Sequence, residues 1–370
     1  MLQLFRPKYE VEEILSELRK VLESGWTGNG PRCAEFERKW CEKTGASNSL
    51  FVNSATAALH IALRLCDLPL GSKVATTGIT FVSTNSVILY EGHVPVFCDI
   101  NPETLSLSWQ SVIKAVEDGC HAVMWVHHSG QVSSDFYTFM DEVRKRNLSA
   151  KVIEDCAHAA GAFYRDGSRV GSRKDTYSCF SYQAVKNLPT ADSGMICVPD
   201  STQHLRAQKL SWMGIDKSTY ERTNVSSNEM YKWQYSVPEL GWKYNGNDIM
   251  ASIALVQLKY LDRDNAYRKQ LYEWYSSKLG TRMTHAKGSS HHLMVIKSDK
   301  RNAIMAALKS NQIAPGVHYQ PNYEFPVFAP YVQGTCPNAE MVSSQILSLP
   351  NHLCMGKEDV DKICDIIRDA

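Results

Sequence analysis

The sequence predicts an α/β protein with a large three-layer domain around a mostly parallel sheet, followed by a smaller C-terminal α+β domain. Through the first two thirds of the chain, short apolar runs alternate with helical patterns. Strands that alternate with helices build parallel sheets with helices on both faces. The 370 residues, at about 150 per domain, correspond to two or three domains. A chain of this size buries a large core without disulfide or metal support.

Seven strands are expected in the large domain. Each is a mostly apolar run that ends beside polar or turn-forming residues. They span 46–53, 73–77, 94–99, 122–127, 151–155, 177–181 and 194–198. Helices are expected between them, where apolar residues recur with helical spacing. These helices span 57–65, 81–91, 108–118 and 134–146.

The pattern changes after about residue 200. Residues 201–240 are polar and irregular, which predicts a long functional loop or interface segment. A strongly apolar helix is expected at 248–261, and a second helix follows through Lys278. The strand and helices expected beyond it span 292–296, 300–310 and 357–368. We therefore place the large domain, which includes an N-terminal helix, at 1–245 and the small domain at 246–370.

Composition and charge exclude several classes of protein. Forty Lys and Arg against 39 Asp and Glu leave a net charge of +1, which argues against a nucleic-acid binder that relies on net charge. No stretch approaches the length of a membrane span, and no signal peptide is visible, so we expect a cytoplasmic protein. The eleven cysteines include no C-x-x-C pair and indicate reduced, mostly buried thiols. The pairs His127–His128 and His291–His292 are poor ligand patterns, because adjacent strand residues point to opposite faces, and no metal is expected.

Ligands of open parallel sheets collect beyond the carboxyl ends of the strands. The first candidate group there is Ser54-Ala55-Thr56-Ala57, where a strand passes directly into a helix. Small residues at that point let backbone N–H groups and two hydroxyls bind an anion at the helix N-terminus. The same residues also suit a plain Ser/Thr N-cap, and the sequence leaves both interpretations open.

The second candidate is Asp155, which ends an apolar strand. A buried carboxylate is costly unless it has a cationic partner or hydrogen bonds. That partner could be the protonated ring nitrogen of a cofactor, an Arg, or the backbone of a helix start. His158 lies one helical turn further along and is expected in the same region.

The third candidate is Lys186, which follows the strand ending at Ser181 and precedes the turn-rich segment 189–194. A lysine alone is a weak signal, but the order of the three features is informative. Pyridoxal phosphate (PLP) needs an anion site, an acid facing its pyridinium nitrogen and an amine for a Schiff base. The chain supplies these features in that order.

These residues and others resemble the sugar aminotransferases of the DegT/StrS group, within the aspartate aminotransferase superfamily of PLP fold type I. The resemblance runs from about Ser24 to Ile366. It rests on motifs that occur in a fixed order: Gly25 to Pro31 with Phe36-Glu37, Asn53 to Leu59, Thr80-Phe81-Val82, Gly92 to Asp99, Glu154 to Gly161, Phe180 to Asn187, Gly241 to Asn245 with Gln257-Leu258, Gly316 to Tyr319, and Ser348-Leu-Pro350.

The resemblance implies roles for the matching residues. Lys186 would bind PLP covalently as a Schiff base and carry the proton between substrate and cofactor. Asp155 would keep the pyridinium protonated, Phe81 would stack on the ring, and His158 would neighbour the phenolic oxygen. The phosphate would be held by Ala55, Thr56, Ala57, Ser181 and Lys243, the last from the partner subunit of a homodimer with shared active sites. The substrate side would include Trp26, Thr27, His318 and Tyr319.

Several positions depart from the family pattern. The phosphate segment has Ser54-Ala55-Thr56 where Ser-Gly-Thr is frequent, and Asp192-Ser193 replaces the usual Glu-Gly after the lysine. The segment 245–248 replaces the usual basic residue and Met, so the loop shape, the substrate preference and the partner contact are in question. Lys186 argues against the dehydrating branch of the family, which has His at this position.

The resemblance implies transfer of an amino group from L-glutamate to the keto carbon of a nucleotide-linked ketodeoxysugar, as in deoxyamino sugar biosynthesis. One alternative is a PLP enzyme with another substrate, either an aminotransferase for a different ketone, such as an aminocyclitol precursor, or a lyase. A non-catalytic PLP-binding regulatory protein is the other alternative, and the altered Asp192-Ser193 loop is the sequence feature that favours it. Neither a nucleic-acid nor a membrane partner is expected.

Overall fold

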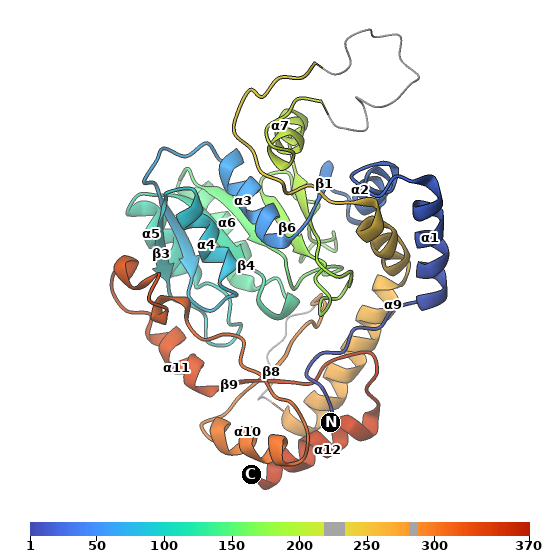
Figure 1. Ribbon diagram of the computed structural model, residues 1–370. Coiled ribbons are helices and arrows are strands. Elements are labelled where there is room, and N and C mark those ends of the chain that lie inside the picture. Colours follow the sequence, from blue (N-terminus) through green and yellow to red (C-terminus); the bar gives the residue numbers. More distant parts are fainter. Residues whose placement is uncertain (218–233, 281–287) are drawn as a thin grey trace.

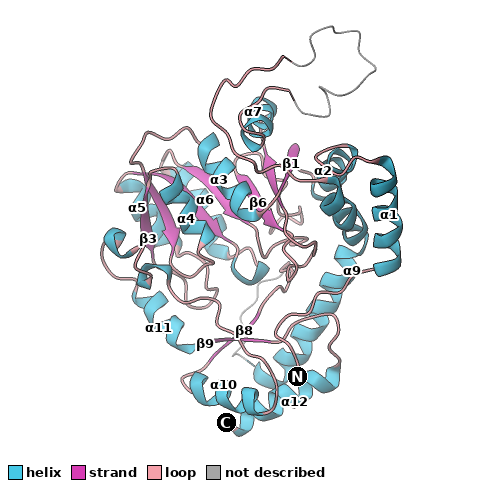
Figure 2. Cartoon of the chain, viewed as in Figure 1, coloured by secondary structure: helices cyan, strands magenta, loops and turns pink. Residues whose placement is uncertain are grey.

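The computed structural model describes residues 1–217, 234–280 and 288–370. A seven-stranded sheet lies between layers of helices, with a smaller part below it (Figure 1, Figure 2). Both bounds of every strand fall within two residues of the expected ones. The strands are β1 Asn48–Val52, β2 Lys73–Thr77, β3 Val94–Cys98, β4 Cys120–Val126, β5 Lys151–Asp155, β6 Tyr177–Ser181 and β7 Gly194–Val198.

The strand order in this sheet is β1-β7-β6-β5-β4-β2-β3. Only β7 runs against its neighbours, pairing antiparallel with β1 and β6, while the other adjacent pairs are parallel. This arrangement confirms the predicted mostly parallel sheet. The parallel strands β4, β5 and β6 end at one edge, where residues that follow them come together.

Helices cover both faces of the sheet, because parallel strands are apolar on both sides. In β4, Ala122 and Met124 face one helical layer, whereas Val123 and Trp125 face the other. The first layer consists of α3 Ala55–Leu65, α4 Ser83–Tyr90 and α7 Ser201–Ser211. The second consists of α2 Pro31–Thr44, α5 Trp109–Glu117, α6 Ser134–Lys145 and the start of α9 Asp248–Leu279.

Helix α7 occupies part of the segment 201–240, where a loop was expected, so the prediction was wrong for those residues. The Asp200 side chain accepts a hydrogen bond of 2.9 Å from the Gln203 amide and caps the helix. Only a narrow side, with Ala207 and Leu210, is buried, and such a short apolar stripe does not stand out in a polar sequence. Residues 218–233 of the predicted loop lie outside the described residues.

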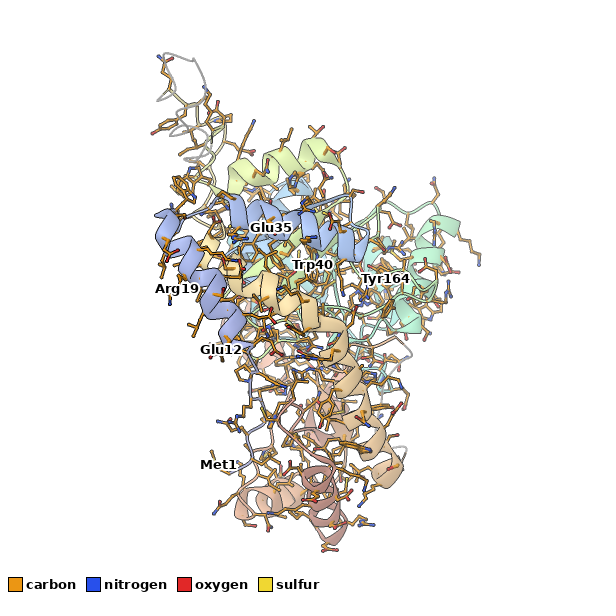
Figure 3. All side chains as sticks on the ribbon, turned by 90° about the vertical axis from the view of Figure 1, so that its right-hand side faces the viewer. Met1, Glu12, Arg19, Glu35, Trp40 and Tyr164 are labelled. Atoms are coloured by element: carbon orange, nitrogen blue, oxygen red, sulfur yellow. The ribbon has the colours of Figure 1, made fainter. Side chains whose placement is uncertain are left out.

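Helix α9 is one continuous helix where two were expected. No Gly or Pro occurs within it, so nothing in the sequence interrupts the backbone hydrogen bonds. Its first half packs beside α1 Val11–Ser24 and α2, and its second half extends into the smaller part (Figure 3). Although α9 has 32 residues, no helix among the described residues is long and apolar enough to cross a membrane.

The smaller part pairs β8 Met294–Lys297 antiparallel with β9 Ile346–Leu349. The helices around this ribbon are α10 Arg301–Ser310, α11 Pro337–Gln345, α12 Lys357–Asp369 and the second half of α9. A separate apolar cluster fills this part, with Leu271 and Tyr275 of α9 among its members. The division of the chain into domains at residue 245 stays a prediction.

The first ten residues connect the two parts of the molecule. Leu2 forms a parallel bridge with Ile313 in the smaller part. Further along, the Gln257 side chain of α9 bonds the backbone of Lys8 and Glu10, and the Tyr9 hydroxyl donates to the carbonyl oxygen of Thr190. This segment therefore reaches the turn that follows Lys186.

Replacing Leu271 tests the contribution of α9 to the smaller part. We expect Leu271→Ala to lower the free energy of unfolding by about 2–5 kcal/mol, because a fully buried leucine leaves a cavity. Met341→Ala is the control, since Met341 is 47% exposed and the change should stay within about 0.5 kcal/mol. Urea denaturation of both variants measures the effect, and equal midpoints would contradict the packing described.

Candidate active site

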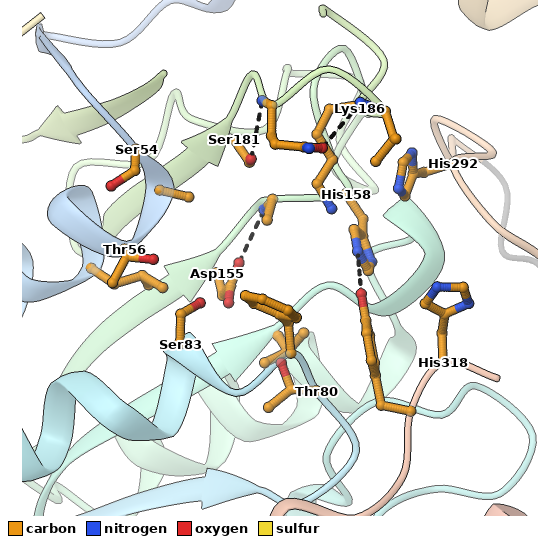
Figure 4. A pocket seen from close by; sticks show the side chains of 18 of the residues that line it. Ser54, Thr56, Thr80, Ser83, Asp155, His158, Ser181, Lys186, His292 and His318 are labelled. Atoms are coloured by element: carbon orange, nitrogen blue, oxygen red, sulfur yellow. Dashed lines mark hydrogen bonds between the residues drawn. The ribbon is translucent and has the colours of Figure 1, made fainter. Parts of the chain in front are cut away.

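A cavity of about 510 Å³ opens at the carboxyl ends of β5 and β6, between the sheet and the smaller part (Figure 4). Nine of the residues predicted from the sequence line it. They are Ala55, Thr56, Phe81, Asp155, His158, Ser181, Lys186, His318 and Tyr319. The cavity thus brings together residues that are up to 264 positions apart in the chain because parallel strands end at one edge and the smaller part covers that edge.

One end of the cavity is the N-terminus of α3. Ser54 caps this helix, and its Oγ accepts a hydrogen bond of 3.1 Å from the Ala57 amide. That bond occupies the amide of Ala57, which had been expected to face an anion. The amides of Ala55 and Thr56 precede the first helical hydrogen bond and have no partner in the part of the chain that the structure describes. They lie at the positive end of the helix dipole, where an anion is stabilised.

Gly194 lets β7 pass close to this helix start. A Cβ atom at Gly194 would lie 2.5 Å from the backbone carbon of Ser54 and 2.6 Å from the amide nitrogen of Ala55. Those atoms are backbone and cannot move aside, so only glycine fits. Its neighbour Ser193 and the hydroxyl of Ser181 also line the cavity, which gives this end a cradle of small polar groups.

Asp155 is buried at the floor of the cavity, with 5% of its surface exposed. Its Oδ2 accepts a hydrogen bond of 2.7 Å from the Thr84 hydroxyl, and its Oδ1 accepts one of 3.0 Å from the Ala157 amide. Burial raises the pKa of this carboxyl, against the opposing effects of the hydrogen bonds and of Lys186. Among the residues described, no side chain forms an ion pair with it. The floor is therefore suited to a cationic atom of a bound molecule.

Lys186 enters the cavity from the turn that follows β6. Its amide donates to the carbonyl oxygen of Gln183 at 2.8 Å, and the Gln183 side chain in turn accepts from the Val185 amide at 3.0 Å. Burial lowers the pKa of Lys186 to about 8, although the Asp155 carboxylate opposes this shift. A larger fraction of this amine is thus unprotonated at neutral pH than for an exposed lysine.

Histidines form one wall of the cavity. His158 Nε2 lies 3.0 Å from the Tyr319 hydroxyl, and the His158 ring stacks on His292 with centroids 4.5 Å apart. His318 Nδ1 lies 2.8 Å from the Ser348 hydroxyl. Burial lowers the pKa of His318 to about 4 and shifts the pKa values of His158 and His292 well below the usual range. The wall is therefore polar but uncharged at neutral pH.

Among the residues that line or support the cavity and were not predicted, three make contacts that shape the site. Phe5 stacks on His292 with a centroid distance of 5.8 Å and meets His318 edge-on at 5.6 Å. Thr84 bonds Asp155, and His292 was considered only as part of a metal-ligand pattern. These contacts join distant parts of the chain, so no local spacing could have revealed Phe5 or Thr84.

Three predicted residues lie elsewhere. Trp26, Thr27 and Lys243 line a second cavity of about 870 Å³, and none of them lines the cavity of Lys186. The Lys243 Nζ sits 3.3 Å from the ring centroid of Trp212. The resemblance implies that Lys243 holds the phosphate in the active site of the partner subunit. This role and the substrate roles of Trp26 and Thr27 stay predictions.

A buried group of side chains at the carboxyl ends of β4 and β5 has the residue types of a metal site. His127, Glu154 and Cys156 offer ligand atoms within 4.8 Å of one another, the one such set among the described residues. His127 Nε2 and Glu154 Oε2 are 2.6 Å apart, and Glu154 also accepts from the Tyr164 hydroxyl. Burial raises the pKa of the Cys156 thiol well above its usual value. His127 and Glu154 belong to a buried hydrogen-bond network that includes Tyr164 and Thr176.

Comparison with known proteins agrees with this geometry. Residues 8–368 match the model of the DegT/DnrJ/EryC1/StrS aminotransferase family. The chain is 33% identical over 375 residues to the spore coat polysaccharide biosynthesis protein SpsC of Bacillus subtilis (strain 168), covering 97% of this chain and 94% of that protein.

Solved structures are similar over the whole chain. The PMP form of the putative sugar aminotransferase Spr1654 from Streptococcus pneumoniae has a TM-score of 0.89 at 28% identity, covering 99% of this chain and 98% of that one. The sugar aminotransferase CalS13 from Micromonospora echinospora has a TM-score of 0.89 at 25% identity, covering 100% of each chain. These findings confirm the resemblance, the fold class and the expected class of enzyme, a PLP-dependent transaminase of the sugar aminotransferase kind. The chain belongs to the DegT/DnrJ/EryC1/StrS aminotransferase family.

Proposed function

We propose that this enzyme holds PLP covalently through Nζ of Lys186 and transfers an amino group from L-glutamate to the ketone of a nucleotide-linked ketodeoxysugar. The observation that carries the proposal is the shared cavity of Lys186 and Asp155, in which the buried carboxylate has no cationic partner among the described side chains. A sugar as acceptor is supported by the names of the similar proteins, which include sugar aminotransferases and a polysaccharide biosynthesis protein.

The residues of the cavity fit PLP at three points. The open amides of Ala55 and Thr56, with the hydroxyls near Gly194, suit a phosphate. Asp155 suits the protonated ring nitrogen, and Lys186 suits the aldehyde carbon. When bound, PLP supplies an electron sink for the pair left behind when a proton leaves the substrate carbon.

The protein's own residues control the protons. Lys186 Nζ, with a pKa of about 8, is positioned to take a proton from the substrate and to return it. Asp155 stays ionised when a cation faces it, because that cation reverses the effect of burial on its pKa. The uncharged histidine wall adds hydrogen-bonding groups without a competing positive charge. Phe81, 59% exposed at the cavity, is free to stack on a planar ring.

The acceptor is the part of the proposal with alternatives. Asp192 and Ser193, which depart from the family pattern, line the cavity and so can change which ketone is accepted. A different ketone, such as an aminocyclitol precursor, is therefore the second candidate. A non-catalytic PLP-binding regulator is disfavoured, because the chain belongs to a family of aminotransferases.

We also propose a homodimer in which Lys243 of one chain serves the phosphate site of the other. Trp26, Thr27 and Lys243 gather in a cavity of their own, which supports the idea that they act together. In a two-fold dimer, one such contact implies its symmetric counterpart, so both active sites would be completed in the same way.

Replacing Lys186 tests the covalent attachment. We expect Lys186→Ala to lose the absorption band of lysine-bound PLP and the change of that band with glutamate, and to transaminate about 10²–10⁴-fold more slowly. Lys259→Ala, a change at an exposed lysine outside the cavity, should match the wild type. A visible spectrum of each purified protein with and without glutamate provides the measurement, and a glutamate response in Lys186→Ala would refute the assignment.

Replacing Asp155 separates stability from function. Since burial raises its pKa, the folded protein binds this proton more tightly than the unfolded chain, and the apoprotein loses stability as pH rises through the carboxyl range. At pH 7 we therefore expect apo Asp155→Asn to melt at the same temperature as the wild type or higher. PLP should stabilise the variant less, by about 1.4 kcal/mol for each tenfold loss of affinity. Melting curves with and without PLP measure this stabilisation. Equal stabilisation of the wild type and Asp155→Asn by PLP would contradict the role of Asp155 in binding the ring nitrogen.

Mixing Lys186→Ala with Lys243→Ala subunits tests the shared site, at a PLP concentration that fills wild-type sites but leaves most Lys243→Ala sites empty. Lys243→Ala should bind PLP about tenfold more weakly, because a charge-assisted contact to phosphate is lost. After Lys186→Ala and Lys243→Ala subunits are unfolded together and refolded, about a quarter of all sites should respond to glutamate, because half of the dimers are mixed and each has one intact site. If the mixture responds no better than the separate variants, Lys243 does not serve the partner's site.

A further inference from the structure

The ammonium group of Lys186 is not fixed by any hydrogen bond or ion pair of its own within the described chain. Its position in the cavity therefore depends on how its backbone is held. On the N-terminal side the turn is local, since the Lys186 amide bonds Gln183 at 2.8 Å. On the C-terminal side the next residue, Asn187, makes contacts that reach across the molecule.

Asn187 is buried, with 4% of its surface exposed, and its side-chain amide is fully engaged. Its Nδ2 donates to Asn265 Oδ1 at 2.7 Å and to the carbonyl oxygen of Ser290 at 2.9 Å. Its Oδ1 lies 2.8 Å from His292 Nδ1, which donates to it. The partners come from α9 and from the segment that leads into β8, so one amide joins the lysine turn to both.

The partners of Asn187 lead back to the loop that follows Asp155. Asn265 Nδ2 donates to the carbonyl oxygen of Ala160 at 2.9 Å, and the Ser290 hydroxyl donates to that of His158 at 2.6 Å. Two glycines leave room for these bonds. A Cβ at Gly161 would lie 2.5 Å from Asn265 Nδ2, and one at Gly130 would lie 2.0 Å from the Ser290 hydroxyl.

We propose that Asn187 is a positioning residue that holds Lys186 at a fixed place relative to Asp155, through Asn265, Ser290 and His292. The proposal rests on the proposed function, because it assumes that Lys186 is the residue that binds PLP. It assigns to Asn187 no contact with substrate or cofactor, since Asn187 does not line the cavity.

Loss of the Asn187 side-chain amide should change both the position of Lys186 and the surroundings of its ammonium group. The buried acceptors and His292 would lose their partners, and buried polar groups without partners draw in water or rearrange. Water around Lys186 would weaken the effect of burial and raise its pKa from about 8 toward that of an exposed lysine. The titratable groups that line the cavity around Lys186 are Asp155, His158, Asp192, His292, His318 and Tyr319.

The test measures the rate at which the apoprotein captures PLP at a series of pH values. The readout is the growth of the absorption band of lysine-bound PLP. Only the unprotonated amine reacts, so the pH midpoint of the capture rate reports the pKa of Lys186. For Asn187→Ala we expect the midpoint to move upward by one unit or more, which lowers the rate at pH 7 about tenfold for each unit. A variant that merely lost stability would keep the midpoint of the wild type.

Asn85→Ala is the matched control. Asn85 is equally buried and also makes three side-chain hydrogen bonds, to Thr76, Thr77 and Asn322, but none of these partners belongs to the lysine turn or to the residues that hold it. It should lose comparable stability and keep the wild-type midpoint. The double variant Asn187→Ala/Asn265→Ala should shift no further than Asn187→Ala alone, because both changes break one chain of contacts.

Each outcome distinguishes the inference from the proposed function. If the wild type captures no PLP, the proposed function fails. If the wild type captures PLP and Asn187→Ala has the same midpoint as Asn85→Ala, the positioning role is overturned. If Asn187→Ala does not fold, Asn265→Ala replaces it in the test. We expect Asn265→Ala to move the pH midpoint of PLP capture upward by a smaller amount, and an unchanged midpoint in this variant also overturns the positioning role.

Discussion

The pairing of β5 with β6 is the interaction on which the active site depends. These strands run parallel, with Asp155 opposite Cys179, so their carboxyl ends lie at the same edge of the sheet. The carboxylate at the end of one strand and the lysine turn beyond the other therefore line the same cavity. The sheet core is apolar on both faces, which makes a one-residue slip of this register costly and keeps the two groups in place.

The same burial that fixes the site also makes it unfavourable when empty. The carboxyl of Asp155 has a raised pKa and the amine of Lys186 a lowered one, which means that both charges are disfavoured by their surroundings. A protein selected for stability alone would replace them with apolar residues. Their presence in one cavity, beside an open helix N-terminus, is understandable if a bound molecule supplies the missing cation and anion.

The sequence predicts the sheet well because each strand is an apolar run that ends in polar or turn-forming residues. It fails for α7, whose buried stripe of Ala207 and Leu210 is too narrow to show in a polar segment, and for α9, which was divided although it has no residue that breaks a helix. In the site, residues at strand ends such as Asp155 and Lys186 follow from local pattern. Phe5 and Thr84 do not, because their roles arise from contacts with residues far away in the chain.

Helix α9 explains how the two parts of the molecule can share one cavity. The smaller part supplies His318 and Tyr319 to the wall, while the sheet supplies Asp155 and Lys186. A cavity between two parts keeps its shape only if the parts are held rigidly, and a continuous helix with its ends in different cores does this. Asn265 lies between those two cores on the same helix and bonds both the lysine turn and the loop after Asp155. A break in α9 near Asn265 would thus remove the rigid support at the point where the site needs it.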